Sequence, residues 1–477
     1  METSTETLKT EVVVIGSGPG GYVAAIRAGQ LGKKVVCIDK EFVGGVCLNV
    51  GCIPSKALIQ ASKSYEHAKH NETMGIFASD VKVDVTRLQA WKGEVVGKLT
   101  GGVRQLLKAA GAQFISGTAT FVAPRKLEVK KADGATVTIE AESIVIATGS
   151  RPIAIPGFVI DQKRILDSTG GLAMDEIPKR LAVIGGGYIG LEMGTLYAKF
   201  GTKVTVIEGT ASLLPGTDPD LVGVVQRKLK KAGVEIHLEA KALGWEEKNG
   251  AAHVRIQTKD GEKIVEVDKV LVTVGRKPNS DGLGLEKIGL KVDKGFVVVD
   301  KQQRTSVAGV YAIGDVCGQP MLAHKASKEA DVVAEVITGH KAEMDSVSIP
   351  AVIFTDPEIA YCGLQQHDAE KQGRKIKIGK FGFAALGRAL AINETDGFVK
   401  IIADAATDEV LGFSVVGPEA SDLISEGALA LEMGAFLPDL ALTVHPHPTL
   451  GEAIMEAAKA ALGESPHLVG GGARKST

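Results

Sequence analysis

The strongest constraint on the fold is a glycine pattern that occurs twice, each time between two apolar strands. In the first copy, Gly16-Ser17-Gly18-Pro19-Gly20-Gly21 follows the apolar run Glu11 to Ile15. A helical stretch to about Leu31 and a second apolar run, Val35 to Asp39, complete the unit. The order of strand, glycine turn, helix and strand predicts a βαβ unit of the kind that binds a dinucleotide.

The second copy keeps the same order. Leu181 to Ile184 leads into Gly185-Gly186-Gly187-Tyr188-Ile189-Gly190, a helix to about Phe200 and a strand from Lys203 to Glu208. An acidic residue stands 23 residues after the first glycine in both copies. One such glycine match is weak, but two complete units predict two Rossmann-like domains in an α/β protein.

Each glycine of the turn has its own expected task. Gly16 and Gly185 permit the tight turn, Gly18 and Gly187 let the backbone approach a pyrophosphate, and Gly21 and Gly190 let helix and strand pack closely. Asp39 is placed to accept hydrogen bonds from a ribose. The alternative for the first copy is a plain glycine turn with an incidental acid.

The acid of the second unit also indicates which nucleotide binds there. Glu208 is followed by Gly209, with no arginine directly beside it. A carboxylate accepts hydrogen bonds from a ribose hydroxyl and repels a 2′-phosphate, so NAD is favoured over NADP.

Two cysteines, Cys47 and Cys52, lie shortly after the first unit, five positions apart. Five residues of regular helix rise about 7.5 Å and turn most of the way to the opposite face, whereas a disulfide needs Cα atoms within about 7 Å. Asn49 and Gly51 tolerate a distorted backbone, and Pro54 is accepted near a helix start. The alternatives are a redox-active pair beside a flavin, which makes the first unit the FAD candidate, and two inert thiols.

The segment from Gly44 to Lys56, with its run Cys-Leu-Asn-Val-Gly-Cys-Ile-Pro-Ser-Lys, resembles the active-site segment of the flavin disulfide reductases, the class I pyridine nucleotide-disulfide oxidoreductases. Within that family it is most similar to the members that oxidise dihydrolipoamide. The resemblance continues through both glycine turns to a carboxy-terminal His-Pro-Thr segment, so it covers nearly the whole chain.

The resemblance implies a role for each reacting group. Cys47 is the outer sulfur that exchanges with substrate and Cys52 the sulfur nearer the flavin. Lys56 pairs with Glu192 beside the flavin, although periodicity alone makes Glu192 equally a surface residue. His447 is the acid/base histidine and Glu452 the carboxylate that orients it. A histidine between prolines is by itself a rigid loop feature, and His445 is a neighbour of lesser importance.

The sequence departs from the family pattern at Gly451, where a serine is common. The change is expected to loosen the helix start without removing a catalytic group.

The resemblance also implies the cofactor contacts. The flavin contacts are Gly16, Gly18, Gly21, Asp39, Lys56, Gly117, Thr148, Gly149, Ser150, Asp315, Met321, Leu322, Ala323 and His324. The NAD contacts are Gly185, Gly187, Gly190, Glu192, Glu208 and Gly275. Outside the family match, His324 is an ordinary surface or cap histidine.

The fold class expected from repeat and resemblance is α/β, with two Rossmann-like dinucleotide-binding domains and a C-terminal α+β dimerisation domain. The expected divisions are 1–150 and 280–349 for a split FAD domain, 151–279 for the NAD domain, 350–470 for the dimerisation domain and 471–477 for a disordered tail. Residues Lys56 to Leu107 are expected to be mainly helical, and Gly117 to Ile146 an antiparallel excursion. Phe398 to Ile402 and Val410 to Val416 predict a hairpin, followed by a helix from Ser421 to Met433.

The implied function is FAD- and disulfide-dependent oxidation of protein-bound dihydrolipoamide with reduction of NAD. The implied partners are a second copy of the chain and a lipoyl domain, carried by the acyltransferase of a 2-oxo acid dehydrogenase complex or by the glycine cleavage carrier protein. The alternatives are other flavin disulfide reductases. Mercuric reductase is disfavoured because the tail has no cysteine pair, soluble transhydrogenase because both cysteines are present, and glutathione reductase because of Glu208. A scaffold role in such a complex is compatible with the enzyme.

Composition limits the remaining function classes. The formal net charge of −2 over 477 residues gives no electrostatic footprint for nucleic acid or an anionic membrane. The first ten residues resemble neither a secretory signal nor a transit peptide, and no run approaches the roughly 20 apolar residues of a membrane span. A cytoplasmic location is expected.

The cysteine count limits the possible sites further. Five cysteines argue against a secreted disulfide framework. Outside the redox pair, Cys37, Cys317 and Cys362 are expected to be packed thiols. No metal site is expected.

Overall fold

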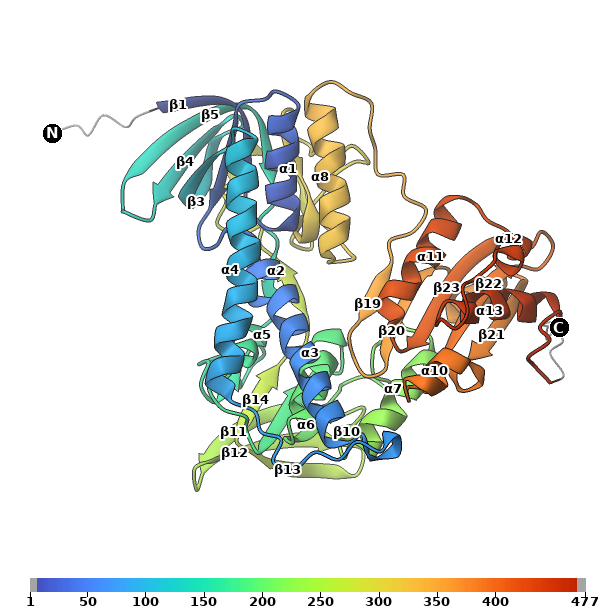
Figure 1. Ribbon diagram of the computed structural model, residues 1–477. Coiled ribbons are helices and arrows are strands. Elements are labelled where there is room, and N and C mark those ends of the chain that lie inside the picture. Colours follow the sequence, from blue (N-terminus) through green and yellow to red (C-terminus); the bar gives the residue numbers. More distant parts are fainter. Residues whose placement is uncertain (1–6, 470–477) are drawn as a thin grey trace.

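The computed structural model describes residues 7–469 and consists of three sheet-centred parts (Figure 1). The expected disordered tail and the first six residues lie outside the described residues. The α/β class and the pair of Rossmann-like units are confirmed, because each unit contains a parallel sheet with a helix between its first two strands.

The first part is built on a six-stranded sheet. Its strands are β1 (Thr7–Ile15), β2 (Val35–Asp39), β3 (Gln113–Ala123), β4 (Lys126–Lys131), β5 (Thr136–Ile146) and β18 (Val310–Ala312). The parallel order is β3-β2-β1-β5-β18, and β4 joins the far ends of β3 and β5 in antiparallel pairing. Because β18 lies beside β5, the chain returns to the first sheet after it has formed the second.

Helices cover one face of this sheet and connect it with the second part. They are α1 (Pro19–Gln30), α2 (Gly45–Val50), α3 (Cys52–Lys69), α4 (Val85–Ala109) and α8 (Ala323–Ile337), with the 3-10 turns η1 (Glu72–Met74) and η3 (Gly314–Cys317). Alternate residues of β1 point to opposite faces: Val12 and Val14 pack with α1 and α8, and Val13 and Ile15 pack against residues of β3 to β5. Figure 1 shows α3 and α4 running from the first sheet down to the second.

The second part repeats the βαβ arrangement. Its parallel sheet has the order β10 (Glu235–His237), β9 (Lys203–Ile207), β8 (Arg180–Ile184), β14 (Lys269–Val272) and β7 (Ile165–Leu166). Its helices are α5 (Ser168–Leu172), α6 (Tyr188–Lys199) and α7 (Pro219–Lys231), and β11 (Lys241–Lys248), β12 (Ala251–Thr258) and β13 (Gly261–Val267) form an antiparallel sheet. The connections to the first part are β6 (Ser150–Pro152), β15 (Arg276–Pro278), η2 (Leu285–Ile288), β16 (Val292–Asp293) and β17 (Phe296–Val297).

The third part is an antiparallel sheet with helices. The strand order is β19 (Ala351–Ile353), β20 (Glu358–Gly363), β23 (Val410–Gly417), β22 (Phe398–Asp404) and β21 (Ile376–Gly382). Its helices are α9 (Gln366–Lys371), η4 (Phe383–Ala385), α10 (Gly387–Ala391), α11 (Ala420–Glu432), α12 (Leu437–Leu442) and α13 (Glu452–Leu462). The predicted hairpin and the helix after it are confirmed as β22, β23 and α11. We call this part the interface domain.

One core cluster joins the three parts. It contains Leu58 of α3, Val183 and Val206 of the second sheet, and Ile359 and Val416 of the interface domain, all almost fully buried. A shared apolar core of this kind fixes how the parts sit against one another. Among the described residues, no helix combines the length and apolar character that crossing a bilayer requires.

Candidate active site

The two cysteines of the redox motif lie on either side of a break between two helices. Cys47 is in α2, Cys52 is the first residue of α3, and Gly51 between them has φ −139° and ψ −114°, far from helical values. A Cβ on Gly51 would lie 2.9 Å from the carbonyl oxygen of Val46. The helix is therefore interrupted where the sequence predicted a distortion, and Pro54 lies in the first turn of α3.

The two sulfur atoms are present as thiols that interact with each other. The hydrogen bond with Cys47 is the largest influence on Cys52. Together with the charge of Lys56 it outweighs the opposing effect of burial and lowers the pKa of Cys52 to about 7. The same hydrogen bond, with burial, raises the pKa of Cys47. Cys52 is also at a helix N-terminus, which favours a thiolate. The pair therefore holds its negative charge on Cys52.

Lys56 and Glu192 form an ion pair beside this thiolate. The Lys56 Nζ donates to Glu192 Oε2 at 2.8 Å, and Glu192 Oε1 accepts the amide N–H of Phe354 at 2.9 Å. The ring of Phe354 lies 4.4 Å from the Lys56 Nζ. Because the Glu192 side chain is buried, its alternative interpretation as a surface residue is wrong.

The other three cysteines are packed, as expected. Burial raises the pKa of Cys37, and it raises the pKa of Cys317 and of Cys362 to about 12. A thiol with a raised pKa is a poor nucleophile near neutral pH, so these three thiols are inert, whereas the lowered pKa of Cys52 makes the Cys47–Cys52 pair the reactive one.

The first glycine turn fits a pyrophosphate. Gly18 is the N-cap of α1 with no side-chain cap, and a Cβ there would have its nearest neighbour at 4.0 Å. At Gly16, with φ +104°, and at Gly21 a Cβ would lie 2.2 and 1.9 Å from backbone oxygens. The turn is therefore closely packed at Gly16 and Gly21 and open at Gly18, where the free N–H groups of the helix can bind an anion.

Asp39 is connected to this turn. Its Oδ2 accepts hydrogen bonds from the Ser17 amide at 2.7 Å and from the Ser17 hydroxyl at 2.8 Å. The carboxylate is therefore held at the end of β2 next to the turn, where the remaining lone pairs of its oxygens can accept from a ribose.

The second glycine turn has the same construction. A Cβ on Gly187, the N-cap of α6, would meet nothing within 4 Å, whereas one on Gly185 or Gly190 would lie 2.6 or 2.2 Å from a backbone oxygen. Glu208 Oε2 accepts the amide N–H of Gly186 at 2.6 Å, as Asp39 accepts that of Ser17 in the first unit. Gly275, with φ +129°, follows β14 at the edge of this unit.

A hydrogen-bond chain joins the two units at Asp315, one of the residues expected to contact the flavin. Arg276 Nε donates to Ser150 Oγ at 2.7 Å, and Ser150 Oγ donates to Asp315 Oδ2 at 2.5 Å. Thr148 Oγ1 donates to the carbonyl oxygen of Asn279 at 2.7 Å, and Gly149 has φ +68°. Asp315 thus lies beside the junction between the parts.

The remaining predicted flavin contacts have clear positions. Helix α8 begins at Ala323, directly after Met321 and Leu322, so its first amide groups are available to a polar ring edge. His324 is exposed and its Nε2 lies 2.7 Å from the carbonyl oxygen of Pro350. A Cβ on Gly117 would lie 2.7 Å from the carbonyl oxygen of Lys130, so the packing of β3 on β4 already requires a glycine there.

The histidine segment lies on the interface domain. His447 Nδ1 is 2.9 Å from Glu452 Oε1, and Glu452 Oε2 accepts the amide N–H of Thr449 at 2.9 Å. Burial acts to raise the pKa of Glu452, but these two hydrogen bonds outweigh it and lower the pKa. The His447 side chain is 78% exposed, so its free ring nitrogen faces outward and can exchange a proton with a molecule docked there.

The structure brings Cys47, Cys52, Lys56 and Glu192 together but leaves His447 and Glu452 elsewhere. Helix α13 packs on α12, β21 and β22, and in Figure 1 it stands well apart from α2. His445 is bonded to Glu426, with 2.9 Å between Nε2 and Oε1. Within one chain the acid/base pair therefore does not reach the sulfur atoms.

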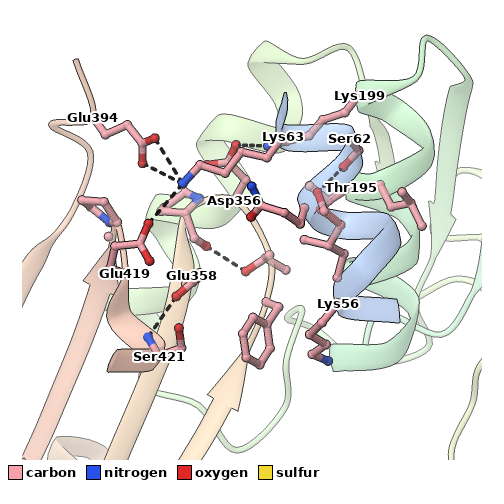
Figure 2. Close-up of a pocket in the computed structure, with 18 residues that line it drawn as sticks. Lys56, Ser62, Lys63, Thr195, Lys199, Asp356, Glu358, Glu394, Glu419 and Ser421 are labelled. Carbon is pink, nitrogen blue, oxygen red and sulfur yellow. Dashed lines mark hydrogen bonds and ion pairs between the residues drawn. The ribbon is translucent and has the colours of Figure 1, made fainter. Parts of the chain in front are cut away.

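A polar cavity of about 220 Å³ lies between α3, α6 and the interface domain (Figure 2). Lys56 is at its edge, and Lys63, Glu394, Glu419 and Asp356 are among the charged residues that line it. Neither Cys47 nor Cys52 lines it. This cavity is therefore next to the redox centre and is not where the sulfur atoms react.

Sequence reasoning missed several residues that support the site. Phe354 packs on Lys56 and holds Glu192, Arg276 holds Ser150, and Ser17 holds Asp39. Ser17 lies between Gly16 and Gly18, so its position in the glycine motif could have identified it. Phe354 and Arg276 belong to strand ends distant in sequence, and no motif of their own marks them.

Comparison with known proteins shows the family to which the chain belongs. The family model for pyridine nucleotide-disulphide oxidoreductases matches residues 10–330, and the model for the dimerisation domain of the same family matches residues 349–458. The dimerisation match supports a homodimer.

Curated relatives that match nearly the whole chain are dihydrolipoyl dehydrogenases. Those of Geobacillus stearothermophilus and Bacillus subtilis are 51% and 52% identical, each over 97% of this chain and 98% of the relative. Among solved structures, LpdA of Mycobacterium tuberculosis aligns with a TM-score of 0.88 at 29% identity, over 94% of this chain and 99% of that one. The disulfide reductase RclA of Escherichia coli aligns with a TM-score of 0.84 at 27% identity over the same shares. The chain therefore belongs to the pyridine nucleotide-disulphide oxidoreductase family, in its dihydrolipoyl dehydrogenase branch.

Proposed function

We propose that the chain oxidises a protein-bound dihydrolipoyl group at Cys47 and Cys52 and reduces NAD. The observation that carries this proposal is the pair of interacting thiols across the break at Gly51, with the Lys56–Glu192 ion pair beside them. A thiolate of lowered pKa next to a second thiol is the arrangement that thiol–disulfide exchange needs.

The first half of the reaction uses the histidine. In the oxidised pair, Cys47 and Cys52 share a disulfide. His447 accepts a proton from one substrate thiol, and Glu452 holds the ring in position and stabilises the imidazolium ion. The substrate thiolate attacks Cys47 Sγ, the S–S bond breaks, and Cys52 leaves as a thiolate.

The second half releases the product. The other substrate thiol attacks the substrate sulfur bonded to Cys47 and the S–S bond to Cys47 breaks, so the substrate leaves as a cyclic disulfide. The proton of this second thiol passes to the departing Cys47 sulfur, which becomes a thiol, while the first proton remains on His447. Both cysteines are then reduced by two electrons, and Lys56 stabilises the negative charge on Cys52. FAD, when bound at the first glycine turn, supplies the two-electron connection between this pair and NAD.

The cofactor assignments rest on the two glycine turns. FAD is assigned to the unit that continues directly into Cys47 and Cys52, and NAD to the unit with Gly185, Gly187 and Gly190. Glu208 supports NAD over NADP because its carboxylate would repel a 2′-phosphate. The proposed divisions are residues 1–150 and 280–349 for FAD, 151–279 for NAD and 350–470 for the interface domain.

The proposed partner is the lipoyl domain of a 2-oxo acid dehydrogenase acyltransferase or of the glycine cleavage carrier protein, met in the cytoplasm. His447 of one subunit is proposed to serve Cys47 of the other. Two exposed apolar side chains shortly before His447 in the chain, Leu442 and Val444 at 81% and 91% exposure, support a subunit contact on this face.

A steady-state comparison tests the proposal. Dihydrolipoamide with NAD should give rapid turnover, dihydrolipoamide with NADP much slower turnover, and glutathione disulfide with NADPH none above background. Cys47→Ser and Cys52→Ser should each abolish dithiol oxidation while FAD absorbance is retained. Activity confined to glutathione disulfide with NADPH would overturn the substrate assignment, and full activity of either serine variant would overturn the assignment of the sulfur atoms.

A further inference from the structure

The loop 209–218 of the second unit is bonded to the turn proposed to bind NAD. The amide of Leu214 donates to the carbonyl oxygen of Gly186 at 2.9 Å, and the amide of Gly186 donates to Glu208 at 2.6 Å. A Cβ on Gly186 would lie 2.7 Å from Leu213 Cδ2. The peptide groups around Gly186 are therefore fixed from both sides, by Glu208 and by the loop.

Leu214 has a backbone conformation that needs support. Its φ is +48°, in the left-handed region that a leucine rarely adopts, and its side chain is 3% exposed. Strained residues of this kind persist where surrounding contacts hold them. The conformation of the loop therefore depends on the contacts at its other end, near Asp218.

The far end is held by the interface domain. Lys400 of β22, which is 0% exposed, donates from Nζ to Asp218 Oδ2 at 2.7 Å. His367 contacts the same carboxylate twice, through its amide at 3.0 Å and its Nδ1 at 2.6 Å. Burial acts to raise the pKa of Asp218, but these partners outweigh it and hold the pKa at about 2.

The Gln365 side chain forms hydrogen bonds with two backbone groups of the loop. Its Oε1 accepts the amide N–H of Asp218 at 3.0 Å, and its Nε2 donates to the carbonyl oxygen of Gly216 at 2.8 Å. The adjacent side chain of Gln366 instead donates to Glu370 at 2.9 Å on the surface of α9. A buried ion pair is weak as a source of net stability, whereas paired directional contacts such as these fix a backbone path.

We propose that Gln365, together with the Asp218–Lys400 pair, positions the 209–218 loop and through it Gly186 and Glu208 for NAD. Gln365 and Lys400 of the interface domain thus act on NAD affinity through the loop, without touching the nucleotide. The proposal rests on the assignment of NAD to the second unit.

Gln365→Met tests the proposal with Gln366→Met as matched control. Methionine keeps the length of the side chain and removes both hydrogen bonds to the loop without leaving a buried charge unpaired. The KM for NAD and the Kd for NADH should rise about three- to tenfold, since two net hydrogen bonds of modest strength are lost. The kcat at saturating NAD, the KM for dihydrolipoamide, the FAD absorbance and the melting temperature should stay near those of Gln366→Met.

A second arm uses the ion pair. Lys400→Met should also raise the KM for NAD, and the double variant with Gln365→Met should raise it by less than the product of the two single effects, because both act through one loop. If Gln365→Met lowers the melting temperature but leaves the KM for NAD unchanged, the positioning role is overturned.

Glu208→Ala separates this inference from the proposed function. An unchanged KM for NAD in Glu208→Ala would defeat the NAD assignment itself. A raised KM in Glu208→Ala beside an unchanged KM in Gln365→Met would defeat only the positioning role.

Discussion

Cys52 is the first residue of α3, within reach of the Cys47 thiol and of the charge of Lys56. These groups decide which sulfur carries the negative charge, and they do so through contacts that a substitution can remove one at a time. Phe354 also acts on this site: its ring packs against Lys56, and its amide donates a hydrogen bond to Glu192.

The pH dependence of alkylation should report the charge on Cys52. Only the thiolate reacts, so in the reduced protein the alkylation of Cys52 by iodoacetamide should rise with pH through a midpoint near its pKa of about 7. Cys47→Ala removes the main cause of the lowered pKa and should move the midpoint up toward the ordinary thiol value of about 8.5. Lys56→Met should move it in the same direction by a smaller amount. Mass spectrometry of the Cys52 peptide follows the reaction, and one common midpoint for all three proteins would contradict this account.

At the scale of elements, the break between α2 and α3 places the cysteines. A Cβ on Gly51 would press on the carbonyl oxygen of Val46 at 2.9 Å and on Cys47 Cα at 3.3 Å. By contrast, a Cβ on Gly93 in α4 would meet nothing within 4 Å. The two glycines therefore provide a test and its control.

Gly51→Ala should destabilise the protein by about 1–3 kcal/mol through overpacking and should slow formation of the Cys47–Cys52 disulfide, because the two sulfur atoms are displaced. Gly93→Ala should form the disulfide at the rate of the unmodified chain and be slightly more stable, since alanine favours the helix. Denaturant unfolding and timed thiol titration during oxidation measure both effects. Unchanged disulfide formation in Gly51→Ala would show that the close contact has no part in placing the sulfur atoms.

Gly451 is the N-cap of α13, directly before Glu452, and its φ of −62° is accessible to any residue. A Cβ there would have ordinary contacts, the nearest at 3.5 Å. Gly451→Ser should therefore stabilise the protein by about 0.5–1 kcal/mol by restricting the unfolded chain, with kcat unchanged. Urea unfolding and steady-state assays check this, and a fall in kcat would mean that the histidine segment needs the freedom of the glycine.

The elements also show how far the sequence can predict this structure. The strand β2 has the predicted bounds because its residues are apolar on both faces, as a central parallel strand requires. The strand β1 begins four residues earlier than the apolar run, because Thr7 to Thr10 pair with Thr138 to Ala141 of β5. That pairing, like the contact of Phe354 with Lys56, joins residues remote in sequence and leaves no local periodicity to recognise.

At the scale of the whole molecule, the three parts share one core and yet keep the reacting groups in two places. The cysteines lie at the junction of the first two parts, and His447 projects from the interface domain beside exposed apolar side chains. A second copy of the chain, docked on that face, is the arrangement by which His447 could serve the sulfur atoms.

Hybrid dimers test this central claim most directly. Cys47→Ser and His447→Gln homodimers should both be inactive in dihydrolipoamide oxidation. If each site takes its cysteines from one chain and its histidine from the other, a heterodimer of the two variants contains one site with both groups intact, and it should recover about half of the activity of the unmodified dimer. A purified heterodimer with no more activity than the two parents would contradict the account, because it would place His447 and Cys47 of each working site on the same chain.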